Sequence, residues 1–209
     1  MIELYAADIR QIAPKAESLV RLLDDERQER VRSLGNSNGA LRCLAAGLLL
    51  YHVFGPRIRD AHFSRGTLGK PALSGETPFN LSHAGDYAVL ARSGEPVGVD
   101  LERIRPIDWR RISARYFHPE EQSFLQSSSY PLESFFWIWT LKESYIKAEG
   151  GGLSIPLGTF CILPQGKNAA CLNRKSPYEF RRYFDFPGYC LSLCGIEREV
   201  SSQIMRIDF

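Results

Sequence analysis

The stretch Trp139-Thr-Leu-Lys142-Glu143-Ser-Tyr-Ile-Lys147 constrains the fold more than any other part of the sequence. Trp139, Glu143 and Lys147 are spaced by four residues, so their side chains share one face if the segment is helical. Pro131 is suited to the first turn of such a helix, and the glycines at 150–152 are suited to its end. The pattern predicts a long helix that presents a carboxylate, an ammonium group and an aromatic ring on one face.

Upstream, the segment Gly98-Val-Asp100-Leu-Glu102 has the pattern of a strand. Side chains at i and i+2 of a strand point the same way, so Asp100 and Glu102 share one face. Adjacent carboxylates repel unless a cation lies between them, and Mg²⁺ typically binds a few carboxylates together with substrate phosphates. Glu143 would supply a third ligand. The alternative is a solvated polar face whose acids pair with Arg103 or Arg105.

Residues outside these two motifs predict a mixture of helices and antiparallel strands. We expect helices over 14–34, 40–54, 109–117 and 119–126, and strands over 2–7, 58–63, 79–83, 87–92, 97–102 and in the tail from 160. The turn at 93–96 favours an antiparallel hairpin between the two strands that flank it. The order of elements predicts an α+β fold of two similar halves that meet near residue 95.

Composition excludes several classes of protein. The 209 residues carry a net charge of +2, which does not indicate a nucleic-acid binder. No apolar run approaches the ~18 residues that span a bilayer, and the first residues lack the basic start and apolar stretch of a signal peptide. Five cysteines without a Cys-x-x-Cys pair favour buried, reduced thiols. We therefore expect a cytoplasmic protein with neither nucleic-acid nor membrane partners.

Several polar residues are candidates for contacts with phosphate groups. His83 follows the apolar segment Phe79-Asn-Leu-Ser82, and Lys70 lies between Gly69 and Pro71. Basic side chains near the N-terminus could clamp a phosphate: Arg27, Arg30 and Arg42. Each also has a simpler interpretation, as a structural histidine, a surface lysine or a solvated helix face. Because no Walker loop or dinucleotide glycine motif is present, a nucleotide here would be held by side chains.

Together these motifs resemble a known family. Phe79-Asn-Leu-Ser-His83, Gly98-Val-Asp-Leu-Glu102 and the stretch 139–147 resemble the three ordered motifs of the 4′-phosphopantetheinyl transferases, and the Gly69-Lys-Pro71 element resembles their Sfp-like (surfactin-synthetase-activating) group. The resemblance runs from about residue 27 to residue 156. It implies one compact, pseudo-dimeric α+β monomer, with halves 1–95 and 96–209 related by a pseudo-twofold and the active site at their interface.

The resemblance also implies a reaction and a set of site residues. The reaction is transfer of the phosphopantetheine arm of coenzyme A to a serine of an apo acyl, aryl or peptidyl carrier protein, with release of adenosine 3′,5′-bisphosphate. Asp100, Glu102 and Glu143 would hold Mg²⁺, with Mn²⁺ as an alternative ion, and Glu143 and Lys147 would be catalytic. Coenzyme A would be contacted by Arg27, Arg30, Arg42, Lys70, Pro71, Ser82, His83 and Lys147.

Three questions stay open at this point. Glu143 is the family's usual candidate base for the serine proton, but a carboxylate bound to Mg²⁺ is a poorer base, and a metal-bound water is the alternative. The basic stretch with Arg103, Arg105, Arg110 and Arg111 is either a docking surface for an acidic carrier or a solvated helix face. The competing functions are a Mg²⁺-dependent phosphohydrolase that uses the same carboxylates and a coenzyme A-binding module without turnover.

Overall fold

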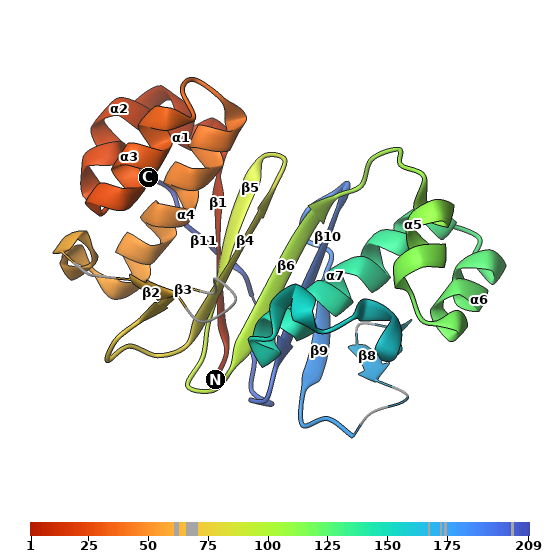
Figure 1. Cartoon of the computed structure of the whole chain (residues 1–209). Helices are drawn as coiled ribbons and strands as arrows, with labels where there is room; N and C mark the ends of the chain where they lie inside the picture. The colour runs from red at the N-terminus through yellow and green to blue at the C-terminus, as the bar shows by residue number, and fades with distance from the viewer. Residues whose placement is uncertain (61–62, 66–70, 167, 172, 174, 202) are drawn as a thin grey trace.

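Two β-sheets form the centre of the molecule, and helices cover the outer face of each sheet (Figure 1). The computed structural model describes residues 1–60, 63–65, 71–166, 168–171, 173, 175–201 and 203–209. The first sheet has the order β11 (Met205–Arg206), β1 (Glu3–Asp8), β5 (Tyr87–Arg92) and β4 (Phe79–Ala84). The second has the order β6 (Val97–Arg103), β10 (Tyr189–Gly195), β9 (Glu179–Tyr183), β8 (Asn168–Cys171) and β7 (Ile162–Gln165). The predicted mixed α+β class is confirmed.

The inner faces of the two sheets pack against each other. Val89 and Ala91 of β5 share one buried cluster with Val99 and Leu101 of β6 and Leu191 of β10. Val99 and Leu101 therefore point into the core between the sheets, as the strand pattern predicts. Because side chains alternate along β6, Asp100 and Glu102 point to the opposite face, toward the helices.

The first sheet is covered by helices from the N-terminal part of the chain. The longest is α4 (Asn38–Phe54), whose Leu48 and Leu49 are fully buried against residues of β5 such as Leu90. Ser37 caps its first turn by accepting a hydrogen bond from the Ala40 amide. The neighbouring helices are α1 (Ile9–Ile12), η1 (Ala13–Lys15), α2 (Ala16–Leu19), η2 (Val20–Leu22), α3 (Asp25–Ser33) and η3 (Pro56–Asp60).

The second sheet is covered by α7 (Pro131–Glu149), the helix that the opening motif predicts. It starts at Pro131 and ends at Gly150, which has the left-handed conformation with φ 76°. The helix packs closely on β6 at Gly98, where an added Cβ would meet the Ser144 backbone oxygen and, at 2.6 Å, the Ala148 backbone nitrogen. This close approach brings Asp100 of β6 beside α7. The other elements of this region are α5 (Trp109–Tyr116), α6 (Pro119–Ser127), η4 (Gly152–Ser154) and η5 (Leu157–Thr159).

Two local predictions are wrong, and a third is refined by the structure. The strands β5 and β6 do not form a hairpin, because β5 pairs with β1 and β4 whereas β6 pairs with β10, so the turn at 93–96 carries the chain from one sheet to the other. The region 14–34 is helical, as predicted, but it is divided into the short helices η1, α2 and η2 and then α3. Within the described residues of 58–63, Pro56–Asp60 is a 3₁₀ helix, and only Phe63 is in a strand, β2 (Phe63–Arg65), which pairs with β3 (Pro71–Leu73).

The end of the chain returns to the first sheet. Strand β11 pairs in parallel with β1, with Met205 opposite Tyr5, and Val200 forms a bridge with Ile2. Cys161, Cys190 and Cys194 are buried free thiols, as expected, and Cys43 is half-buried. Among the helices of the described residues, none has the length and apolar content needed to cross a membrane.

Candidate active site

Two hollows meet at the edge where β4, β6 and α7 come together. The first, which we call the basic cleft, has a volume of about 640 Å³ and is lined from the side of the first sheet by Arg27, Arg30, Arg42 and His83. The second, which we call the apolar cavity, has a volume of about 790 Å³ and is lined largely by Tyr116, Trp139, Ile155, Pro156, Leu157 and Gly158. Asp100 and Glu102 line both hollows. A ligand that extends from one hollow into the other must therefore pass these two carboxylates.

The three predicted metal ligands line one cavity. Asp100 and Glu102 come from β6, Glu143 comes from α7, and all three line the apolar cavity. Burial and the negative charge of Asp100 raise the pKa of Glu102. Burial, Asp100 and Glu102 also raise the pKa of Glu143, to about 7, although Lys147 opposes the shift. Burial is the larger cause of both shifts, and the negative charge of a neighbouring carboxylate adds to each.

The donor atoms of these carboxylates suit a hard divalent cation. Within the described residues, Asp100 Oδ2 is buried without a hydrogen-bond partner, which is costly for a carboxylate oxygen unless a ligand completes it. Carboxylate oxygens are the donors that Mg²⁺ and Mn²⁺ prefer. The simpler interpretation, in which Asp100 pairs with Arg103 or Arg105, does not describe its contacts, because its ion-pair partner is Lys147.

Lys147 joins the two sides of the site. Its Nζ lies 2.5 Å from Asp100 Oδ1, and it donates to the Val99 carbonyl at 3.2 Å and to Ser82 Oγ at 3.4 Å. Trp139, Glu143 and Lys147 are all half-buried along one face of α7, as their spacing predicts. Lys147 faces the basic cleft, whereas Trp139 and Glu143 face the apolar cavity.

The three N-terminal arginines line one wall, which we call the basic wall. Arg27 pairs with Asp24 at 2.6 Å, and its guanidinium lies 4.2 Å from the centre of the Phe63 ring. Arg42 donates to the carbonyl of Gly85 at 3.2 Å, in the turn between β4 and β5. Arg30 lines the same cleft. The structure thus brings together, in one concave wall, residues that the sequence separates over two helices.

Ser82 and His83 also lie in the basic cleft. Ser82 is buried, and its hydroxyl donates to Asp100 Oδ1 at 2.9 Å, so it is part of the carboxylate network. His83 is exposed on the cleft surface, where partial loss of water and the charges of Arg42 and Lys147 lower the pKa of its imidazole. Pro71 is the first residue of β3, and Lys70 lies outside the described residues.

The apolar cavity contains the residues that the sequence did not reveal. Tyr116 ends α5, and residues 155–158 return beside α7 after its terminal glycines. The buried Lys142 holds this return in place: its Nζ lies 2.7 Å from Glu121 and donates to the carbonyls of Leu157 at 2.8 Å and Phe160 at 2.7 Å. No local pattern marks residues 155–158, because only the packing of the chain after α7 brings them to the site.

The candidate docking arginines are exposed. Arg103 ends β6, Arg105 follows it, and Arg110 and Arg111 lie in the first turn of α5. The guanidinium of Arg110 lies 4.4 Å from the centre of the Trp109 ring. Their exposure leaves this surface accessible, and its use for docking stays a prediction.

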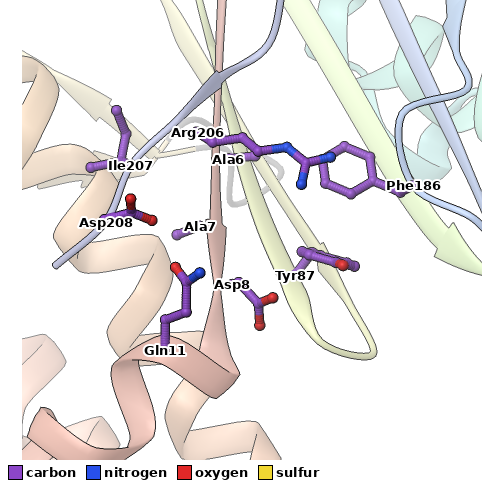
Figure 2. Close-up of a pocket in the computed structure, with 9 residues that line it drawn as sticks. All are labelled: Ala6, Ala7, Asp8, Gln11, Tyr87, Phe186, Arg206, Ile207 and Asp208. Atoms are coloured by element: carbon purple, nitrogen blue, oxygen red, sulfur yellow. The ribbon is translucent and has the colours of Figure 1, made fainter.

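A third hollow lies beside β1 and the C-terminal segment (Figure 2). Asp8, Tyr87 and Arg206 are among the residues that line it, and it shares none of its lining residues with the basic cleft or the apolar cavity. Its volume of about 50 Å³ leaves room for a few water molecules and not for a nucleotide.

Comparison with known proteins agrees with the motifs. Residues 96–194 match the 4′-phosphopantetheinyl transferase superfamily. The 4′-phosphopantetheinyl transferase gsp of Aneurinibacillus migulanus is 35% identical over 185 residues, which cover 85% of this chain and 78% of that protein. The 4′-phosphopantetheinyl transferase Sfp of Bacillus subtilis strain 168 is 28% identical over 204 residues, which cover 92% and 91% of the two chains.

The crystal structure of Thermotoga maritima holo-[acyl-carrier-protein] synthase aligns with 50% of this chain and 64% of its own, with a TM-score of 0.42 and 17% identity. The sequence relatives carry the conclusion, because they extend along most of the chain. They confirm the resemblance to the Sfp-like group that the motifs indicated. The chain belongs to the 4′-phosphopantetheinyl transferase superfamily.

Proposed function

We propose that the basic cleft, the three carboxylates and the apolar cavity form one active site for phosphopantetheine transfer. Members of the family transfer phosphopantetheine from coenzyme A to carrier proteins, and this chain does the same. The observation that carries the assignment of the site is that Asp100 and Glu102 line both hollows. The reacting phosphate then lies at the carboxylates, with the nucleotide in the basic cleft and the arm leaving toward the apolar cavity.

The basic wall supports binding of the nucleotide end of coenzyme A. Guanidinium groups bind phosphate oxygens with charge-assisted hydrogen bonds, and Arg27, Arg30 and Arg42 line the cleft together. His83 lines it as well, and Ser82 contributes through its bond to Asp100. Lys70 and Pro71 are proposed as further contacts on the strength of the resemblance alone.

The carboxylates would hold the metal. Asp100, Glu102 and Glu143 supply hard oxygen donors. Among the described residues, Asp100 Oδ2 is buried without a hydrogen-bond partner, so this oxygen is available to a ligand. When bound, Mg²⁺ or Mn²⁺ neutralises charge on the phosphate oxygens and on the leaving group. Lys147 adds a positive charge beside the same carboxylate.

The reaction breaks one bond and forms one. The hydroxyl oxygen of the carrier serine attacks the phosphorus that bears the pantetheine arm, and the anhydride bond to the other phosphate breaks. The electron pair of that bond stays with adenosine 3′,5′-bisphosphate, where Lys147 stabilises the developing negative charge. The serine proton passes to Glu143, directly or through a water. Burial and Asp100 raise the pKa of Glu143 to about 7 in the absence of a metal, and a bound cation would lower that pKa and make Glu143 a weaker base.

The acceptor would approach past the exposed arginines. We propose that Arg103, Arg105, Arg110 and Arg111 steer an acidic apo acyl, aryl or peptidyl carrier protein toward the site. The helix α5, which carries two of them, ends at Tyr116 on the rim of the apolar cavity. A carrier bound along this surface would therefore have its serine near the carboxylates.

The finer description of the molecule is also a proposal. One long helix covers the outer face of each sheet, which supports two similar halves, 1–95 and 96–209, related by a pseudo-twofold. The segment with β11 returns to β1, so the second half contributes a strand to the first sheet. We propose that this unit works as a cytoplasmic monomer.

Intact-mass measurement tests the proposed function. A panel of apo carrier proteins is incubated with the protein, coenzyme A and Mg²⁺, and at least one carrier should gain the mass of the phosphopantetheine arm. Asp100→Ala and Glu143→Gln should lower the rate by about 10²-fold or more while the far-UV circular dichroism is unchanged. Glu149→Gln is the matched control, since Glu149 is an exposed carboxylate at the end of the same helix.

Two outcomes would contradict the assignment. Full activity of either carboxylate variant would show that these residues do not form the metal site. Release of phosphate from small phosphate esters without a carrier would favour a phosphohydrolase that uses the same carboxylates.

A further inference from the structure

Where the two sheets meet, at a seam between β4 and β6, side chains and not a backbone ladder make the hydrogen bonds between the strands. Strand β4 is the last strand of the first sheet, and β6 is the first strand of the second. The Val99 amide of β6 donates to Asn80 Oδ1 at 2.8 Å, and the Leu101 amide donates to Ser82 Oγ at 3.2 Å. Two side-chain oxygens of β4 thus occupy the places that carbonyl oxygens of a neighbouring strand would take.

These two hydrogen bonds flank Asp100 in the sequence. Ser82 also donates to Asp100 Oδ1, so its hydroxyl belongs to the carboxylate network itself. Asn80 differs, because it is only 4% exposed and lines neither the basic cleft nor the apolar cavity. Its bond to the Val99 amide therefore acts on the site only through the position of the strands.

The two strands that Asn80 joins carry opposite walls of the site. Strand β4 carries His83 and leads to the turn at Gly85, whose carbonyl accepts from Arg42 of the basic wall. Strand β6 carries Asp100 and Glu102. A displacement of one strand along the other would move the basic wall relative to the carboxylates. Misplacement of about 1 Å costs on the order of 10²-fold in rate when groups on both sides must act on one substrate.

We propose that Asn80 is a positioning residue, which holds β4 against β6 so that the basic wall and the carboxylates contact the same phosphate group. This inference rests on the proposed function of the cleft. It predicts that the two walls bind coenzyme A and metal cooperatively, and that the cooperativity depends on the bond from the Val99 amide to Asn80.

Binding measurements without turnover test this role. The dissociation constant of coenzyme A is measured by calorimetry without metal and with saturating Mn²⁺, and the ratio of the two values is the coupling factor. Asn80→Leu removes the oxygen that accepts from Val99. We expect the coupling factor to fall at least tenfold, while the affinity for Mn²⁺ alone and for coenzyme A alone each change less than about threefold, because each wall stays intact. The transfer rate to a carrier should fall with the coupling.

Two variants separate positioning from stability. Asn80→Asp keeps the acceptor oxygen and should keep most of the coupling. Thr140→Val removes a buried hydrogen bond, the 2.7 Å contact between Thr140 Oγ1 and Ser192 Oγ, which joins α7 to β10 without crossing the seam. It should lower stability and leave the coupling factor unchanged. If Asn80→Leu does not fold, Asn80→Ala is measured in its place with the same criteria.

The outcomes for Asn80 and for the function are distinct. A coupling factor in the Asn80→Leu or Asn80→Ala variant equal to that of the wild type would overturn the positioning role and leave the proposed function intact. An equal loss of coupling in Thr140→Val would also overturn it, because the effect would then follow stability. Absence of coenzyme A binding by the wild-type protein would overturn the proposed function itself.

Discussion

The surroundings of Glu143 raise the pKa of its carboxyl group, and this shift can be tested through the stability of the protein. Without a divalent cation, burial and Asp100 raise its pKa from 4.5 to about 7. Between these two values the folded state keeps the proton that the unfolded state has lost. The folded state thus binds more protons, so the free energy of unfolding falls as the pH rises through this window. Below it both states are protonated, and above it the loss is complete.

We therefore predict that Glu143→Gln stabilises the metal-free protein only at higher pH. In urea unfolding with a chelator, the variant should match the wild type at about pH 4 and exceed it by about 1–3 kcal/mol at about pH 8. Glu149→Gln, on the same helix but exposed, should show no such difference. The same change in stability with pH for the wild type and Glu143→Gln would show that Glu143 does not cause it.

The sequence predicted the positions of some site residues much better than the contacts of others. The i, i+2 pattern of Asp100 and Glu102 and the i, i+4 pattern of Glu143 and Lys147 predict which side chains share a face, because such patterns depend only on local geometry. The resemblance also predicts Ser82 as a contact of coenzyme A, and the structure places Ser82 in the basic cleft, where its hydroxyl donates to Asp100. That contact depends on how two sheets meet, which no local pattern encodes.

Among the elements, α6, α7 and the return at 155–160 are joined by one buried ion pair. Lys142 and Glu121 are both fully buried, 2.7 Å apart. Glu121 also accepts from the amides of Ile162 at 2.7 Å and His118 at 2.9 Å. The pair thus connects the start of α6 and the start of β7 to the middle of α7. Its hydrogen bonds fix the backbone that forms one wall of the apolar cavity.

Removal of one partner of this pair should be more damaging than removal of both. Lys142→Met leaves the carboxylate of Glu121 buried without its cation, and we expect a loss of about 3–5 kcal/mol in urea unfolding. The double variant Lys142→Met with Glu121→Leu should recover part of that loss, because no buried charge remains, although the backbone groups that the pair bonds lose these partners. Equal stability of the single and double variants would contradict this account of the pair.

The long elements were predictable and the short ones were not. The helices α4 and α7 each carry a clear start and stop, such as Pro131 and Gly150, and both were predicted within two residues. The region before α3 contains enough leucines for a long helix, but Leu23 turns inward with an extended backbone and ends the run. Such breaks are decided by packing against α4, and the apolar spacing alone does not show them.

Residues of both sheets contribute to the candidate site. The way the two sheets meet also explains why the predicted hairpin is wrong. Strands β5 and β6 are adjacent in sequence, yet they belong to different sheets and pack face to face. Besides the bonds between β4 and β6, another hydrogen bond joins the two sheets: the Asp86 amide, beside Gly85, donates to the hydroxyl oxygen of Tyr189 in β10 at 3.0 Å. The two sheets therefore share a core, a seam of hydrogen bonds and the proposed ligand site.

This sharing predicts how coenzyme A changes unfolding. Bound across β4 and β6, it should stabilise both sheets at once, so thermal unfolding should stay a single transition that moves upward with ligand. At 100 times the dissociation constant the free energy of unfolding should rise by about 2.7 kcal/mol. At the same coenzyme A concentration, Arg30→Met should reduce this rise because it removes a charge from the basic wall, whereas Arg59→Met, which changes an exposed arginine outside both hollows, should not. Two transitions, of which coenzyme A moved only one, would show that the ligand binds one sheet alone.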